Sequence, residues 1–219
     1  IDFMTPGLVV TTRRPRHALT ADVELSHRTY QETDLETVDF KGRVGGTLDV
    51  TRRLAVGFDV SMNRLQSAVI VDNLPVDVVF GTRDLPDRIG LVPITQTTEA
   101  VWARYTSYWL TNQLTASHST IEYGQAPLLG GGTASVSSRN EVTQDVSNRT
   151  ELRVSHRLRF LTELFARNRE FSDDPERDST VLGTAGKVEL DITPFVSLEL
   201  NAGYAKEEFD NPLVDSAPT

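Results

Sequence analysis

Residues 139–171 constrain the fold of this chain more than any other stretch. They hold two long segments joined by the short turn Ser155–Arg157. From Val142 to Val154 the aliphatic residues all stand at even positions, whereas the odd positions carry charged or hydroxyl side chains. Side chains of an extended strand point alternately to opposite sides, so this period of two predicts a strand with one apolar and one charged face. The stretch therefore predicts a long β-hairpin whose faces meet different environments.

The same alternation recurs along the rest of the chain. It predicts about ten strands, at residues 7–14, 18–30, 38–50, 54–62, 97–109, 114–120, 139–154, 158–171, 182–192 and 196–204. Most of them are long compared with the usual strand of about five to six residues. A tilted transmembrane strand needs ~9–11 residues to cross the hydrocarbon, so these strands are long enough to cross and project beyond it. Their length favours a membrane barrel.

The connections between these strands alternate in length. Those near residues 15, 52, 111, 156 and 194 are short, and those near 33, 80, 130 and 175 are longer, with long outer loops at 66–96 and 124–138. A turn containing Thr or Ser recurs at 48–54, 152–158 and 190–196. Short turns at one end and long loops at the other are typical of outer-membrane barrels. We expect an all-β, antiparallel, up-and-down transmembrane β-barrel, with residues 1–219 forming a single domain.

Composition excludes several classes of protein and site. The net charge of −9 argues against a nucleic-acid surface, which needs a basic stripe. The chain has no cysteine, which excludes disulfides, zinc–thiolate sites and iron–sulfur clusters. No stretch approaches the ~18 apolar residues of a transmembrane helix. Aromatic residues make up only 7% of the chain, which is few for two aromatic girdles and keeps a soluble β-sandwich open as an alternative.

Charged residues fill one face of the three strands between residues 141 and 191. Opposite charges on facing strands stabilise a sheet by about 0.2–1 kcal/mol per pair. They are either a structural ladder that rigidifies the barrel or the lining of a hydrated path for a polar solute. The predicted lumen-lining residues are Glu141, Asp145, Arg149, Glu151, Arg153, Arg159, Glu163, Arg167, Arg169, Lys187 and Glu189.

Four aromatic residues cluster near one predicted strand end: Trp102, Tyr105, Tyr108 and Trp109. Amphipathic aromatic rings are enriched where a membrane meets water. The cluster therefore predicts an interfacial aromatic belt, and the alternative is the core of a sandwich.

No pattern in the sequence indicates catalysis or cofactor binding. His118 and Ser119 are adjacent strand residues, so they point to opposite faces and cannot act together as base and nucleophile. The glycines at 130–132 lack the Lys-Ser/Thr of a phosphate-binding loop. The acidic residues at 173–178 lack the spacing of a calcium loop and indicate a solvated turn. We predict that the protein is not an enzyme and has no metal or cofactor.

Several short motifs resemble the β-barrel porin type 2 family of bacterial outer-membrane proteins. They are residues 6–8, 16–19, 46–54, 167–171, 178–179 and 190–193. The resemblance implies a barrel in the outer membrane, often linked to exopolysaccharide export, without known catalytic residues. Such proteins normally end in a strand with a terminal aromatic residue, which this chain lacks. We therefore expect the sequence to be part of a longer protein, with its strands closing alone or within a larger barrel.

These observations favour a passive outer-membrane conduit for a polar solute or for polysaccharide export. Its expected partners are outer-membrane lipid and, in export, polysaccharide or export-machinery proteins. One alternative is a non-conducting structural or surface-binding barrel whose long loops engage a partner. A less favoured alternative is a soluble carbohydrate-binding β-sandwich.

Overall fold

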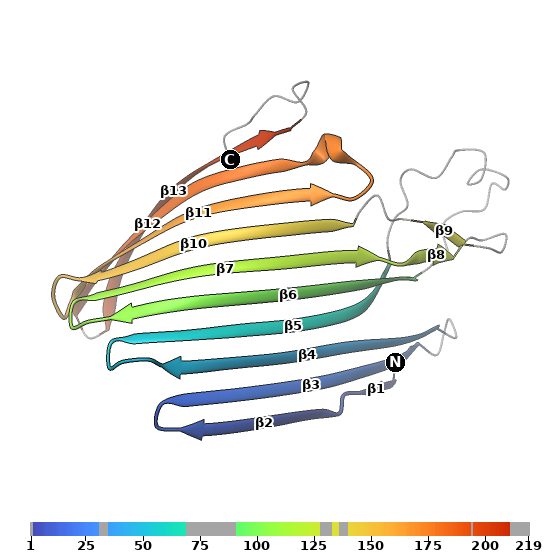
Figure 1. Ribbon diagram of the computed structural model, residues 1–219, viewed down its shortest axis with the longest axis horizontal. Coiled ribbons are helices and arrows are strands. Elements are labelled where there is room, and N and C mark those ends of the chain that lie inside the picture. The colour runs from blue at the N-terminus through green and yellow to red at the C-terminus, as the bar shows by residue number, and fades with distance from the viewer. Residues whose placement is uncertain are drawn as a thin grey trace.

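A computed structural model describes residues 2–30, 35–68, 91–127, 133–135, 140–193 and 195–210. One antiparallel sheet contains all the long strands, which lie side by side in chain order (Figure 1). Its strands are β1 (Asp2–Met4), β2 (Gly7–Arg14), β3 (His17–Tyr30), β4 (Leu35–Asp49), β5 (Leu54–Ala68), β6 (Leu91–Thr106), β7 (Leu110–Tyr123), β10 (Glu141–Arg153), β11 (Leu158–Phe171), β12 (Ser179–Thr193) and β13 (Val196–Phe209). The predicted all-β, up-and-down order of about ten strands is confirmed.

The first two strands share one position in the sheet. β1 pairs with residues 27–29 of β3 and β2 pairs with residues 17–24 of the same strand. Pro6 separates them, and its carbonyl accepts a hydrogen bond from the Leu25 N–H at 3.0 Å. Proline cannot donate to a ladder, so within sheets it is confined to edges, strand starts and bulges. The sheet therefore has ten strand positions, and β1 and β2 form one edge.

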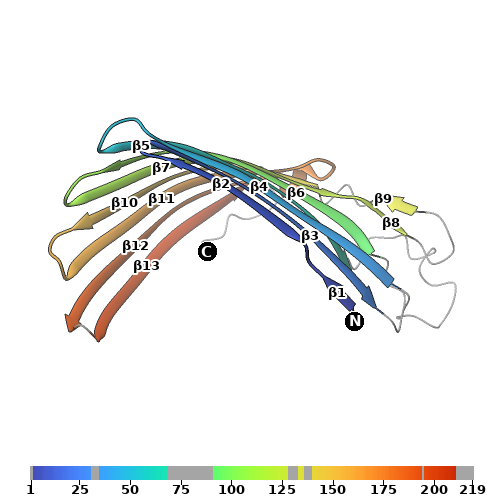
Figure 2. The ribbon, with the colours of Figure 1, turned by 90° about the horizontal axis from the view of Figure 1, so that it is seen from below.

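The described sheet is open. β1 and β2 are hydrogen-bonded only to β3, and β13 only to β12, so the two edges do not meet. The sheet is strongly arched along its strands (Figure 2). Since β2 runs toward the short turns and β13 away from them, the two edges are antiparallel to each other.

Hydroxyl side chains close most of the short turns. Thr51 Oγ1 accepts hydrogen bonds from the Arg53 and Leu54 N–H groups, and Ser155 Oγ does the same in the turn between β10 and β11. The sequence prediction of a turn near residue 111 is wrong by about three residues. Ser107 bonds to both the N–H and the carbonyl of Leu110, so the turn is residues 107–109 and β7 begins at Leu110.

Strand register gives the sheet two faces of different character. Val146 faces Ala116 and Ala166, whereas its neighbour Asp145 faces Ser117 and Arg167. The first row belongs to an apolar face and the second to a charged face. The two faces differ in exposure: Val101, on the apolar face, is 60% exposed, whereas the Asp145 side chain is only 19% exposed.

No second layer covers the apolar face in the part of the chain that the structure describes. Ala55 is the one buried hydrophobic residue among these residues, and it lies on the charged face, opposite Arg104. Within the same residues, no helix is long and apolar enough to cross a membrane. Most large apolar side chains of the described sheet are thus exposed rather than packed in a protein core.

The long connections are only partly described. Of the predicted loop 66–96, residues 66–68 belong to β5 and 91–96 to β6, and the rest lies outside the described residues. In the loop 124–138, β8 (Gln125–Pro127) and β9 (Thr133–Ser135) form a small separate hairpin, and residues 128–132 and 136–138 lie outside the description. The acidic turn after β11 contains a 3-10 helix, η2 (Pro175–Arg177).

Candidate functional site

The charged face carries all eleven residues predicted to line a lumen. Register places Asp145 opposite Arg167, Arg149 opposite Glu163, and Arg159 opposite Glu189, and the other predicted residues follow at intervals of two. The face therefore runs without a break from β10 across β11 to β12. The alternation that predicted a shared face is reproduced by the strand register.

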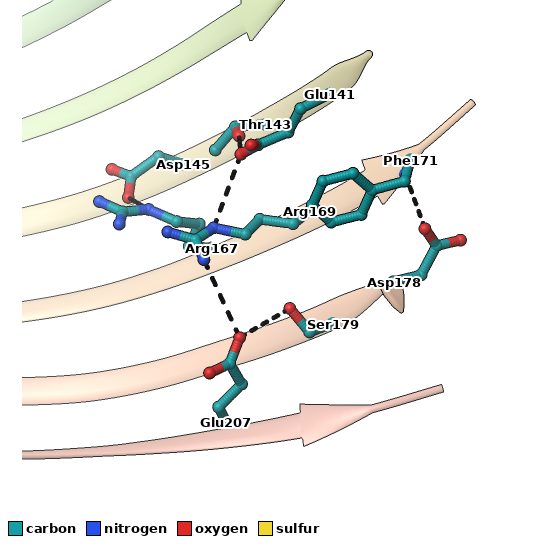
Figure 3. Close-up of polar contacts among 9 residues, drawn as sticks. All are labelled: Glu141, Thr143, Asp145, Arg167, Arg169, Phe171, Asp178, Ser179 and Glu207. Atoms are coloured by element: carbon teal, nitrogen blue, oxygen red, sulfur yellow. Dashed lines mark hydrogen bonds and ion pairs between the residues drawn. The ribbon is translucent and has the colours of Figure 1, made fainter. Parts of the chain in front are cut away.

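Two arginines on β11 hold the long-loop end of this face together (Figure 3). Arg167 Nε lies 3.2 Å from Asp145 Oδ2 on β10. Arg169 lies between strands on both sides, with Nε 3.7 Å from Glu141 Oε1 and Nη1 4.0 Å from Glu207 Oε1 on β13. One side chain thus links β10, β11 and β13 across β12.

Hydroxyl groups hold the carboxylates of this network. Ser179 Oγ, which is almost fully buried, donates to Glu207 at 2.9 Å, and Thr143 Oγ1 donates to Glu141 at 2.7 Å. Arg169 Nε is buried without a hydrogen bond in the described structure, so its bond to Glu141 is electrostatic only. Glu207 and Ser179 were missed by sequence reasoning, although their odd positions on β13 and β12 would have placed them on this face.

A second charge cluster lies nearer the short turns. Arg159 Nη2 is 2.9 Å from Glu189 Oε2, and Lys187 bonds both Glu189 and, at 3.0 Å, Glu199 Oε2. At this end, charges on β10 and β11 do not pair across the two strands within the described residues. Arg153 lies opposite Arg159, and each of these two like charges forms an ion pair with a different residue. Arg153 pairs instead with Glu151 on its own strand, at 2.7 Å.

Between the two clusters lies a hollow of about 420 Å³ on the charged face. Arg149 and Glu163 face each other beside it, and neither forms an ion pair within the described residues. Its lining also includes Ala185 and Gly203, whose small size opens the space. Among the described residues, the hollow therefore presents a cation and a carboxylate outside the ion pairs of the two clusters, and these can bind polar groups of a solute by charge-assisted hydrogen bonds.

The four predicted belt aromatics separate in the structure. Tyr105 lies on the apolar face opposite Leu54, and Tyr108 and Trp109 occupy the exposed turn before β7. Trp102 lies instead on the charged face opposite Gly57, with the Arg104 guanidinium 5.1 Å from its ring centroid. Phe195, 96% exposed in the turn before β13, is an aromatic at the same end that sequence reasoning missed.

Other polar groups on this face lie nearer the N-terminus. Arg43 on β4 binds Asp59 on β5 through Nη2 at 2.6 Å. Asp39 is buried, and its carboxylate accepts the Gln66 N–H at 3.0 Å. Sequence reasoning did not single out these residues, although the alternation of β4 gives their face. Charge pairing on this face thus extends well beyond the hairpin that first indicated it.

The histidine–serine pair shows no catalytic geometry. His118 faces Glu99 on the apolar side, whereas Ser119 faces Thr98 on the charged side and its hydroxyl lies 3.1 Å from that threonine's hydroxyl. Across the described ranges, no group of three or more His, Asp or Glu residues is placed to hold a metal ion.

Exchanging the charges of Asp145 and Arg167 tests whether this pair stabilises the sheet. Asp145→Arg sets two cations opposite each other and should lower the free energy of unfolding by about 1 kcal/mol. Adding Arg167→Asp should restore most of that loss, because the pair is rebuilt in reverse. Urea titration in detergent micelles measures the two single variants and the double variant. A loss in the double variant equal to the sum of the two single losses would contradict the pairing.

Comparison with known proteins agrees with this architecture. No curated protein matches the chain significantly. A family model described as "Putative beta-barrel porin 2" matches residues 1–218, nearly the entire sequence. The resemblance noted from short motifs is thereby confirmed. With its long antiparallel strands and its segregated apolar and charged faces, the chain belongs to the beta-barrel porin 2 family.

Proposed function

We propose that the sheet is the wall of a transmembrane barrel in the bacterial outer membrane, and that its charged face lines a passive conduit for polar solutes. Polysaccharide under export is one such solute. No catalytic step is part of this proposal. The observation that carries it is the oblique path of the apolar side chains across the sheet.

This oblique path follows from the register. Leu19, Phe58, Val101, Val146 and Leu182 form one row perpendicular to the strands, with Lys206 as its last member on β13. On β1 and β2, which share one edge of the sheet, the apolar residues lie on the long-loop side of this row, at Met4, Leu8 and Val10. On β13 they lie on the short-turn side, at residues 196–204. The apolar band therefore shifts steadily from strand to strand.

The size of this shift supports a membrane wall. The band moves by about ten residues over nine strand steps, and with ~3.3 Å per residue and ~4.8 Å between strands this corresponds to a tilt of roughly 35–40°. Strands of outer-membrane barrels tilt by ~35–45° to the membrane normal. The apolar band thus lies parallel to a flat membrane only when the strands are tilted to the membrane normal as they are in a barrel wall. A soluble sandwich requires no such drift.

The exposed apolar face supports the same proposal. Leu164, Leu182 and Leu200 are more than half exposed, and further exposed large apolar residues occur on every long strand from β3 to β13. So extended an apolar surface is stable only against another apolar phase. In a bilayer, all backbone groups must also be satisfied by pairing, which a closed antiparallel barrel achieves. The family name points to the outer membrane as the location.

A second candidate is a non-conducting structural barrel. The observation that favours it is that large aromatic side chains lie on the charged face, among them Trp102 against Gly57 and Phe165 against Gly183. Bulky rings in a narrow barrel fill the lumen rather than leave a channel. Under this candidate the ion pairs rigidify the wall, and function rests with the loops.

Conductance separates the two candidates. The full chain, inserted in planar bilayers, should conduct ions, and Arg149→Glu should shift selectivity severalfold toward cations because a free positive charge beside the hollow becomes negative. The matched control is Lys206→Glu, which makes the same charge change on the apolar face and should leave selectivity unchanged. Absence of conductance from folded, inserted protein would exclude the conduit and leave the structural barrel.

A further inference from the structure

A second hollow, of about 380 Å³, lies at the short-turn end of the sheet. Four arginines line it: Arg16, Arg52, Arg53 and Arg104. They come from three separate segments, namely the turn between β2 and β3, the turn between β4 and β5, and β6. Asp49 is the one carboxylate in the lining, so the hollow carries a clear excess of positive charge.

Backbone hydrogen bonds fix these three segments relative to one another. The Asp49 N–H donates to the Arg16 carbonyl at 2.8 Å, and the Thr106 N–H donates to the Arg53 carbonyl at 2.7 Å. Thr51 closes the middle turn by accepting the Arg53 N–H. The Trp102 ring also positions the guanidinium of Arg104 through a cation–π contact, with 5.1 Å between the guanidinium carbon and the ring centroid. The arginines are therefore presented from a pre-organised frame.

Among the described residues, the four arginines lack the carboxylate partners that several arginines of the charged face have. In the described part of the chain none of them forms an ion pair, whereas Arg43, Arg159 and Arg167 each contact a carboxylate within 3.2 Å. Crowded like charges are unfavourable unless a counter-ion reduces their repulsion. Guanidinium groups bind phosphate oxygens in a planar, two-pronged geometry, which suits them to that role.

We propose that this hollow binds a multiply charged phosphate-type anion. Four cations against one carboxylate exceed what a single carboxylate ligand would balance, so the charge favours a phosphate monoester or a diphosphate. Two sources carry this chemistry, a soluble phosphorylated solute and a phosphorylated lipid headgroup at the membrane rim. Binding does not require that the barrel conducts, so the inference stands apart from the proposed function.

The chain contains two tryptophans, and one of them reports on this site. In a variant that carries Trp109→Phe, tryptophan fluorescence comes from Trp102 alone, whose ring contacts Arg104. We expect saturable changes in emission when pyrophosphate is added to the full chain in zwitterionic detergent. The titration is run at 0.15 M salt, where the Debye length of ~8 Å screens general attraction between exposed charges. Calorimetry measures the same dissociation constant independently.

Variants assign the binding to the hollow. Arg52→Gln with Arg53→Gln should weaken pyrophosphate binding at least tenfold, and Arg104→Gln should do so through a different segment. Arg157→Gln is the matched control, because Arg157 lies in another short turn at the same end and does not line the hollow. An equal loss of pyrophosphate affinity in the Arg157→Gln control would overturn the proposal. Unchanged affinity in both the Arg52→Gln/Arg53→Gln variant and the Arg104→Gln variant would overturn it as well.

A second set of titrations distinguishes a soluble phosphorylated solute from a phosphorylated lipid headgroup. Short-chain phosphatidic acid in mixed micelles presents the same phosphate group on a lipid. Saturation by pyrophosphate and by lipid assigns a general phosphate site, and saturation by the lipid alone assigns a headgroup site. Saturation by neither overturns the inference. Loss of conductance with intact pyrophosphate binding would contradict only the proposed conduit.

Discussion

Replacing Leu200 with arginine is expected to lower the free energy of unfolding of the membrane-inserted protein by about 2–4 kcal/mol, the cost of a cation at the middle of a barrel's lipid face. Leu200 is 60% exposed on the apolar face. It stands at the centre of the apolar run of β13, which extends from Val196 to Tyr204. If this face meets hydrocarbon, the guanidinium has no water or partner there.

The neighbouring residue supplies a matched control. Asn201 is exposed on the charged face and lines the hollow beside Arg149, so Asn201→Arg makes a similar addition of volume and charge in a polar environment. We expect its cost to stay below about 1 kcal/mol, as for most exposed substitutions. Unfolding by urea in lipid vesicles, followed by gel mobility, compares the two. Equal losses would show that β13 does not separate lipid from water.

Replacing Gly57 with alanine should also be strongly destabilising, by about 1–3 kcal/mol, as expected for overpacking. A Cβ atom at this position would lie 2.3 Å from the Trp102 ring and 2.6 Å from the carbonyl oxygen of Gly46. The ring can move, but the carbonyl belongs to the adjacent strand and is fixed by the ladder. Either the strands separate locally or the tryptophan leaves its position on the charged face.

Gly186→Ala is the control for this effect. The nearest atom to a Cβ at Gly186 is the Ala202 oxygen at 3.9 Å, an ordinary contact, so alanine fits there without strain. Because alanine restricts the unfolded chain, this variant should be neutral or slightly more stable. Adding Trp102→Ala to Gly57→Ala should recover only part of the loss, since the carbonyl contact remains. Full recovery would mean that the ring alone excludes a side chain.

Much of this fold could be predicted because its signal is local. The positions of Val142 and Asp145 alone indicate their faces, since side chains alternate along any extended strand. Strand length and the hydroxyl-containing turns are local as well, and the structure shows that Thr51 and Ser155 close their turns directly. The turn at 107–109 was misplaced because its signal is one serine beside several aromatic residues that also suit a strand.

The sequence by itself determined the strands, their two faces and the set of charges on one face, because each depends on residues close together in the chain. Only the tertiary structure decided how these charges pair. In the described part of the chain it leaves Arg149 and Glu163 without an ion pair, gives Arg169 a partner on β13, and places Arg104 and Arg52 in the lining of one hollow. It also sets the oblique apolar band. The physical reason is that register is a property of pairs of strands, so the neighbours of a side chain depend on pairing between segments distant in sequence.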